Sequence, residues 1–146
     1  MYQTQVVPLE SIIPLRHKVL RPGRPVEECT YKEDLAEGCF HVATLEQGKV
    51  IGIASFYPES HQLAASSNAW RLRGMATDPD YRARGLGAQL LMYGMDLCAK
   101  AGGDVLWCNA RTEAVPFYSK LNFVIKGEEF QIAGIGPHYF MSKTLV

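Results

Sequence analysis

Residues 70–103 read WRLRGMATDPDYRARGLGAQLLMYGMDLCAKAGG and divide into three parts. Trp70–Ala76 predicts a β-strand. From Gly87 to Ala101 small and apolar residues recur every three or four positions, which predicts an amphipathic helix that Gly102 and Gly103 end. The turn between strand and helix contains two arginines and two glycines, which are Arg82, Arg84, Gly85 and Gly87.

This turn has the features of an anion-binding site. A helix N-terminus presents backbone N–H groups that have no partner inside the helix, together with the positive end of the helix dipole. Glycine lets the backbone approach a ligand closely, and arginine adds positive charge. We therefore expect an anion, in particular a phosphate group, to bind at this turn.

Two familiar phosphate-binding patterns fit the turn poorly. The P-loop requires Lys followed by Ser or Thr after its last glycine, whereas Gly87 is followed by Ala88 and Gln89. The dinucleotide fingerprint requires a third small residue where this chain has Leu90, and an acidic residue at the end of the next strand, whereas Asp104 precedes that strand. The turn alone is also consistent with an ordinary strand–turn–helix unit whose glycines only allow close packing.

The composition limits the class of protein. The 146 residues are 47% apolar, and 15 Lys and Arg balance 15 Asp and Glu, which fits one domain over residues 1–146 without a nucleic-acid partner held by overall charge. No apolar run approaches the ~20 residues of a membrane span, and the first residues lack a signal-peptide pattern, so we expect no membrane partner. Four cysteines and four histidines show no paired spacing, which favours free thiols in the cytoplasm and no metal site.

The remaining sequence predicts elements on both sides of residues 70–103. Further strands are expected at 3–7, 40–45, 50–57, 104–109, 124–132 and 138–145. A helix is expected over 9–20, with Pro14 in its first turn, and a shorter one from the N-cap Thr112 to about Leu121. Asn122 is expected to take the left-handed conformation that ends the shorter helix. This order predicts a mixed α/β sheet.

Two motifs in this order resemble the GCN5-related N-acetyltransferases, the GNAT superfamily. Arg82-x-x-Gly85-x-Gly87 resembles their Arg/Gln-x-x-Gly-x-Gly/Ala pyrophosphate loop. Residues 109–123 resemble their Asn-x-x-Ala-x-x-Phe-Tyr-x-x-x-Gly-Phe pattern, with matches at Asn109, Phe117, Tyr118 and Phe123. The spacing before Ala114 is longer here, and Asn122 stands where glycine is typical. The resemblance covers most of the chain and points to a bacterial branch of unassigned substrate.

The resemblance implies a fold, an activity and a co-substrate. The fold is a mixed central sheet with a splayed strand pair, flanked by helices. The activity is transfer of an acetyl group from acetyl-coenzyme A to a primary amine, on a small molecule or a peptide, by direct attack in a ternary complex. A non-catalytic domain that senses acyl-coenzyme A is the alternative. A homodimer is common among such relatives and stays open here.

The resemblance also assigns cofactor-binding residues. It implies that the pyrophosphate is held by the backbone N–H groups of Arg82, Ala83, Arg84, Gly85, Leu86, Gly87 and Ala88. Met75, Ala76 and Thr77 would offer backbone groups to the pantetheine arm, and an N–H of Met75 or Ala76 would lie at the thioester oxygen, where negative charge develops. Asn109 and Phe117 would also contact the cofactor. For Asn109 the alternative is a residue of the turn at the end of its strand.

Tyr118 is the catalytic residue that the resemblance implies. A phenol with a pKa near ~10 stays protonated at neutral pH, so Tyr118 would act as general acid toward the departing thiolate. The alternative is a tyrosine that only packs beside Phe117 in the core.

The acceptor side is less defined. Arg73 lies two residues before Met75, where it either binds a substrate carboxylate or is solvated. His138 and Glu28 are further substrate-side candidates, and the general base is open among Glu27, Glu28, Glu33 and His138. The acidic residues of 26–37 are either a solvated surface or a wall that attracts a cationic amine.

Overall fold

The computed structural model describes residues 1–145. The strands are β1 (Tyr2–Val7), β2 (Phe40–Glu46), β3 (Lys49–Pro58), β4 (Ala69–Thr77), β5 (Val105–Arg111), β6 (Val124–Ile125), β7 (Phe130–Ile132) and β8 (Gly136–Thr144). The helices are α1 (Leu9–Leu20), α2 (Leu86–Lys100) and α3 (Val115–Lys120), with 3₁₀ turns η1 (Val26–Cys29), η2 (Lys32–Leu35), η3 (Pro79–Tyr81) and η4 (Thr112–Ala114). The predicted mixed α/β architecture is confirmed.

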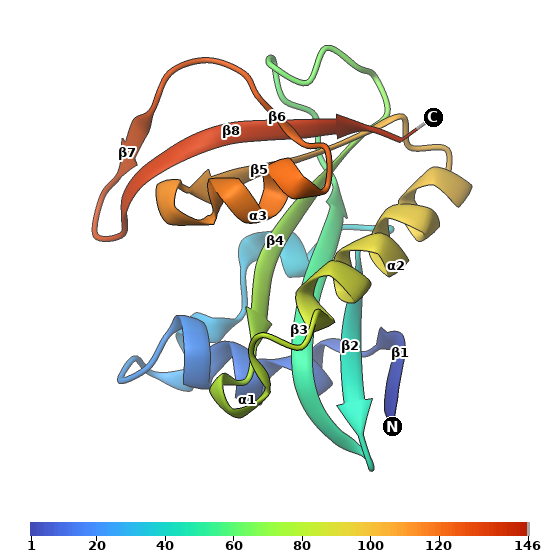
Figure 1. The fold of residues 1–146 in the computed structure, drawn as a ribbon, viewed down its shortest axis with the longest axis vertical. Coiled ribbons are helices and arrows are strands. Elements are labelled where there is room, and N and C mark those ends of the chain that lie inside the picture. Colours follow the sequence, from blue (N-terminus) through green and yellow to red (C-terminus); the bar gives the residue numbers. More distant parts are fainter. Residues whose placement is uncertain (146) are drawn as a thin grey trace.

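The strands form one mixed sheet in the order β1-β2-β3-β4-β5-β8-β6, and β7 also pairs with β8. Helices α2 and α3 cover one face of this sheet, and α1 covers the other (Figure 1). We call these the α2 face and the α1 face. Strands β2 and β3 form a hairpin that turns at Gln47 and Gly48, whose positive φ angles of 49° and 81° fit a two-residue hairpin loop.

Strands β4 and β5 are parallel neighbours, and they pair only at their beginnings. The register runs from Ala69 opposite Val105 to Arg71 opposite Trp107 and then ends. Beyond these three pairs the two strands diverge, as Figure 1 shows where β5 leaves β4 toward α3. The splayed strand pair that the sequence predicts is therefore present.

A β-bulge in β4 lies beside this opening. Ile53 of β3 pairs with Ala76, whereas Ser55 pairs with Arg73, so two steps along β3 correspond to three along β4. Gly74 lies at the extra position with φ of 66°, a conformation that favours glycine. The bulge is not part of the strand predicted from the sequence over Trp70–Ala76.

The bulge changes which face of the sheet each side chain occupies. Arg73 and Ala76 both point to the α1 face, although they are three residues apart. Leu72 and Met75 consequently both belong to the apolar cluster on the α2 face. The bulge thus sends an arginine to one side of the opening and a methionine to the other.

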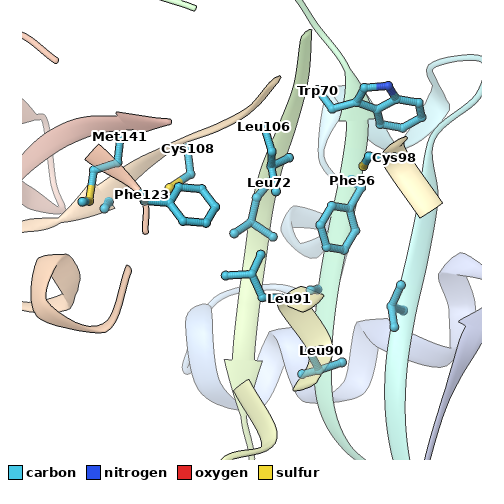
Figure 2. Packing of buried hydrophobic residues seen from close by; sticks show 13 residues of the cluster. Phe56, Trp70, Leu72, Leu90, Leu91, Cys98, Leu106, Cys108, Phe123 and Met141 are labelled. Carbon is cyan, nitrogen blue, oxygen red and sulfur yellow. The ribbon is translucent and has the colours of Figure 1, made fainter. Parts of the chain in front are cut away.

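Apolar side chains from both faces hold the sheet between its helices. On the α2 face, Phe56, Leu72, Leu90 and Leu91 are buried together where α2 crosses β3 and β4 (Figure 2). On the α1 face a second cluster has Ile12 and Leu15 of α1 against Ala43, Ile53 and Ala76 of the sheet. Burying such side chains contributes about 1.5–3 kcal/mol for each large one.

Three local predictions were wrong, and the first concerns Pro14. This proline lies inside α1 and not in its first turn. Proline has no N–H, so the carbonyl four residues earlier loses its helical hydrogen bond. That carbonyl lies on an exposed part of α1, while Ile12 and Leu15 of the same helix are buried. Tertiary packing therefore continues the helix through the proline.

The other two errors lie near the second motif. Thr112 does not cap α3, because its hydroxyl donates to Glu129 Oε2 at 2.7 Å and the N-cap position is Ala114. The strand expected over 124–132 is split into β6 and β7, because the four residues 126–129 lie opposite only two residues, 139–140, of β8. The left-handed conformation predicted for Asn122 is confirmed by its φ of 70°.

The cysteines are free thiols, and Cys29, Cys98 and Cys108 are buried. No helix within residues 1–145 combines the length and apolar character that a bilayer crossing requires. Within the same residues, no group of three or more His, Cys, Asp or Glu side chains is placed to hold a metal ion.

Gly94 tests the contact between α2 and the sheet. A Cβ at this position would overlap the Phe56 ring, which is fully buried. We expect Gly94→Ala to lower the free energy of unfolding by about 1–3 kcal/mol through overpacking, measured by urea denaturation. Gln89→Ala, at an exposed position of α2, is the control and should change it by less than about 0.5 kcal/mol. A stabilised Gly94→Ala variant, as helix propensity alone would give, contradicts this packing.

Candidate active site

The 82–88 loop, residues Arg82–Ala88, leads from η3 into α2. Ala83 and Gly85 have positive φ angles of 64° and 75°, and Gly85 occupies the N-cap position, so α2 begins at Leu86 and not at Gly87 as expected. None of the seven backbone N–H groups of this loop has a hydrogen-bond acceptor within residues 1–145. An anion at the start of α2 would find unpaired donors and the positive end of the helix dipole.

The two arginines of the loop are exposed. The Arg84 guanidinium donates to the Tyr2 hydroxyl at 2.8 Å and to the Asp80 carbonyl at 3.4 Å, and it lies 5.0 Å from the centre of the Tyr81 ring. Arg82 has no hydrogen-bonded side-chain partner within the described residues. Both add positive charge beside the unpaired N–H groups, and Arg84 is held in place by its neighbours.

Gly87 allows α2 to approach the splayed strands. A Cβ at Gly87 would lie 3.2 Å from Met75 Cε and 3.4 Å from Phe117 Cζ. The Tyr118 hydroxyl in turn lies 4.0 Å from Met75 Sδ, and the rings of Phe117 and Tyr118 meet edge to face with centroids 5.1 Å apart. Met75, Phe117 and Tyr118 therefore stand together at the opening between β4 and β5, next to the start of α2.

The phenol of Tyr118 lies in an environment that keeps it protonated. Burial raises its pKa above the usual value for tyrosine, and the neighbouring Cys108 raises it further. Burial also raises the pKa of the Cys108 thiol to about 12. At neutral pH both groups are uncharged, and Tyr118 retains a proton that it can donate.

A cleft of about 670 Å³ opens at the splay, and we call it the central cleft. Of the residues that the sequence singled out, its lining includes Arg73, Met75, Asn109, Tyr118 and His138. Phe117, Ala76, Thr77 and the 82–88 loop are not part of this lining; the loop lies at the start of α2, which packs on the α2 face. The predicted residues thus form two groups, one lining the central cleft and one at the 82–88 loop. Met75 and Tyr118 lie where the two groups meet.

Arg73 and His138 line the cleft, and each has a defined partner outside the lining. The Arg73 guanidinium contacts Glu33 Oε1 at 2.6 Å and lies 4.1 Å from the centre of the Tyr31 ring. His138 is buried, and its Nδ1 lies 2.8 Å from the Gly136 carbonyl oxygen. A carbonyl only accepts, so Nδ1 carries the hydrogen and Nε2 is the proton acceptor of the neutral ring.

Glu28 does not join this group. Glu28 is exposed, and its carboxylate lies 2.6 Å from the guanidinium of Arg24, four residues earlier in the chain. It does not line the central cleft. Asn109 does line it, on the side of β5 that also carries Trp107 and Arg111, because alternate residues of a strand share a face.

Most of the charge in the cleft comes from arginines that were not predicted as site residues from the sequence. Besides Arg73, the lining contains four arginines, which are Arg21, Arg24, Arg71 and Arg111. Strand periodicity could have indicated Arg71, because it lies two residues before Arg73 and therefore on the same face. The positions of the other three depend on tertiary structure.

A buried polar network supports the wall of the cleft. Arg16 of α1 is fully buried, and its Nη1 lies 2.7 Å from Asp34 Oδ2. Asp34 also accepts hydrogen bonds from the Tyr31 backbone N–H and the Tyr57 hydroxyl, both at 2.6 Å. Burial alone would raise the pKa of Asp34. The hydrogen bonds from Arg16, Tyr57 and Tyr31 outweigh this effect and hold the pKa below its usual range. The network ties η2 and Tyr31 to the sheet.

Comparison with known proteins identifies the family. A model of the acetyltransferase (GNAT) family matches residues 9–123, most of the chain. The chain belongs to this family. It is also 42% identical over 145 residues to the uncharacterized N-acetyltransferase YitI of Bacillus subtilis (strain 168), covering 99% of this chain and 97% of YitI.

Solved structures agree with a GNAT fold. Escherichia coli ElaA has a TM-score of 0.79 at 18% identity, over 98% of this chain and 99% of ElaA. An aminoglycoside 6'-N-acetyltransferase solved in complex with coenzyme A has a TM-score of 0.78 at 16% identity, over 99% of this chain and 97% of that one. At these identities the likeness concerns the fold, and it confirms the GNAT fold predicted from the two motifs.

Asp34→Asn tests the buried network. This change leaves the fully buried Arg16 without its counter-charge, so we expect the free energy of unfolding at pH 7 to fall by about 3–5 kcal/mol. Because the pKa of Asp34 is lowered on folding, its stabilisation is present above the unfolded value near ~4 and is lost as pH falls through the lower folded value. The difference between the wild type and the variant should therefore shrink below about pH 4.

Urea denaturation at pH 7 and at pH 3 measures this difference. Asp96→Asn is the matched control, because Asp96 pairs with Lys100 at 2.9 Å on the exposed side of α2 and should contribute less than about 1 kcal/mol. A difference for Asp34→Asn that is small at pH 7, or that grows on acidification, contradicts the stabilising role of the ion pair.

Proposed function

We propose that this protein transfers an acetyl group from acetyl-coenzyme A to a primary amine by direct attack in a ternary complex. Membership of the GNAT family supports acetyl transfer. The observation that carries the proposal is the opening between β4 and β5, which has the unpaired N–H groups of the 82–88 loop on one side and Tyr118 beside it. An elongated cofactor with a phosphate group at one end and a reactive thioester at the other fits this arrangement.

In this proposal the 82–88 loop binds the pyrophosphate. Seven backbone N–H groups without an acceptor in the described part of the chain favour a dianionic group, together with the positive end of the α2 dipole and the charge of Arg82 and Arg84. The pantetheine arm then passes along the free edge of β4 at Met75–Thr77, where its amides replace the backbone partners that β5 no longer supplies. Phe117 and Asn109 flank this path.

The chemistry needs two donors and a base. An N–H of Met75 or Ala76 stabilises the oxygen of the thioester carbonyl as negative charge develops. The Tyr118 hydroxyl donates to the departing sulfur. The amine, attacking from the central cleft, loses a proton to a base such as Nε2 of His138 or the Glu33 carboxylate, directly or through water.

The first test compares Gly85→Asp with Gly85→Asn. A Cβ at Gly85 meets no atom within 4 Å, and Asp and Asn are both among the residues that tolerate the left-handed backbone conformation found there, with φ of 75°. The two variants therefore share the backbone strain of replacing glycine and differ mainly in charge. An aspartate at the start of α2 favours the helix dipole but repels pyrophosphate. We expect Gly85→Asp to weaken coenzyme A binding at least about tenfold more than Gly85→Asn, measured by isothermal titration calorimetry.

This comparison separates binding from folding. Thermal unfolding should show Gly85→Asp to be at least as stable as Gly85→Asn. Equal affinities of the two variants for coenzyme A would refute the loop assignment. A wild-type protein that binds acetyl-coenzyme A but frees no thiol with any amine tested would be a sensor and not an enzyme.

The second test is Tyr118→Phe. Removal of the hydroxyl takes away the donor to the leaving sulfur but keeps the ring, so kcat should fall about 100-fold or more while the affinity for coenzyme A stays the same. Tyr139→Phe is the control, because Tyr139 is also half-buried against the same apolar cluster but does not line the cleft. Thiol release with a saturating amine gives kcat. Full activity of Tyr118→Phe would remove Tyr118 from the mechanism.

A further inference from the structure

The lining of the central cleft has an unbalanced charge. It contains five arginines, which are Arg21, Arg24, Arg71, Arg73 and Arg111, and no aspartate or glutamate. Three of these arginines have a carboxylate partner just outside the lining: Arg24 with Glu28, Arg71 with Glu59, and Arg73 with Glu33. Arg21 and Arg111 have none within residues 1–145, so the cleft carries two uncompensated positive charges.

These arginines lie on one side of the opening. Arg71 and Arg73 of β4 point to the α1 face, and Arg111 of β5 points the same way, directly opposite His138 of β8. Arg21 follows α1 and reaches the same space. The 82–88 loop precedes α2, which packs on the other face. The arginines of the central cleft are therefore separate from those proposed to flank the pyrophosphate.

Tyr31 holds part of this cluster in position. Its buried ring lies 4.1 Å from the Arg73 guanidinium and 5.5 Å from that of Arg21. The Tyr31 backbone is itself fixed by Asp34 of the buried network. The Nε atom of Arg21 is buried without a hydrogen-bond partner inside the described part of the chain. A guanidinium that is positioned in advance and lacks an acceptor is suited to binding an oxyanion.

We propose that the acceptor is an amine that also carries an anionic oxygen group, a carboxylate or a phosphate, which Arg21 and Arg111 bind. This inference rests on the proposed acetyl transfer and narrows its substrate class. The anionic group would bring its amine to the side of the opening where Met75 and Tyr118 line the cleft. A polycationic amine such as an aminoglycoside would meet repulsion from the same charges.

The first experiment compares four amines with the wild-type protein and acetyl-coenzyme A, with thiol release as the readout. β-Alanine presents a carboxylate, phosphoethanolamine presents a phosphate, ethanolamine is the counterpart without an anionic group, and kanamycin is a polycation. We expect kcat/KM for at least one of the anionic amines to exceed that for ethanolamine about tenfold or more, and kanamycin to be the poorest acceptor. The better of β-alanine and phosphoethanolamine identifies the anionic group.

The second experiment uses variants of Arg21 and Arg111, the two cleft arginines for which residues 1–145 supply no carboxylate partner. Arg111→Gln and Arg21→Gln should each raise KM for the preferred anionic amine about tenfold, leave ethanolamine unaffected, and leave coenzyme A affinity unchanged. Arg111→Lys, which retains the charge, should recover part of the loss. Lys32→Gln is the matched control, because Lys32 is exposed on η2, outside the cleft lining.

Each outcome bears on one proposal. Preference for ethanolamine or kanamycin, with normal coenzyme A binding and thiol release, overturns the anionic acceptor but leaves acetyl transfer intact. Loss of coenzyme A affinity in Arg111→Gln and Arg21→Gln overturns it as well, because the arginines would then serve the cofactor. Failure of the wild type to bind coenzyme A at all overturns the proposed function itself.

Discussion

The site depends on the early end of pairing between β4 and β5. After three pairs the strands diverge, and each then has an edge with backbone groups that its neighbour no longer satisfies. Such an opening in the middle of a sheet is unfavourable unless the surrounding structure maintains it. Here β3 holds β4 along its other edge through the bulge, and β8 holds β5 along its whole length. Met75, Phe117 and Tyr118 fill the apolar side of the gap.

This constraint explains why the two faces of the opening differ in chemistry. On the α2 face the start of a helix supplies backbone donors, which suit a phosphate whatever the rest of the ligand is. On the α1 face the charge comes from side chains on β4, on β5 and after α1, which sequence change can alter without disturbing the fold. The bulge at Gly74 connects the two faces, because it directs Arg73 to one side and Met75 to the other.

The sequence predicts best where local rules and tertiary structure agree. The strand, turn and helix of residues 70–103 have strong local signals, and so does Asn122, whose side chain tolerates a left-handed backbone. The bulge escapes prediction because Gly74 also fits a regular strand, and only the register against β3 exposes the extra residue. The arginine cluster escapes because Arg21, Arg73 and Arg111 are far apart in the sequence. The acidic run of 26–37 is misleading in isolation, since Glu28 and Glu33 pair with arginines.

The buried network shows how the rigid fold and the charged cleft are connected. A fully buried guanidinium is costly unless its donors are satisfied, and Arg16 donates to Asp34, the Cys29 carbonyl and Ser55. These partners fix the 3₁₀ turns η1 and η2, in which Cys29 and Asp34 are the buried residues. The Arg16 guanidinium also lies 3.9 Å from the centre of the Tyr31 ring. Arg73 contacts the same ring, but it faces the cleft, whereas Arg16 is buried in the network. Because Tyr31 contacts both, a loop that would otherwise be loosely held becomes a defined wall, and the charges it positions can discriminate between acceptors.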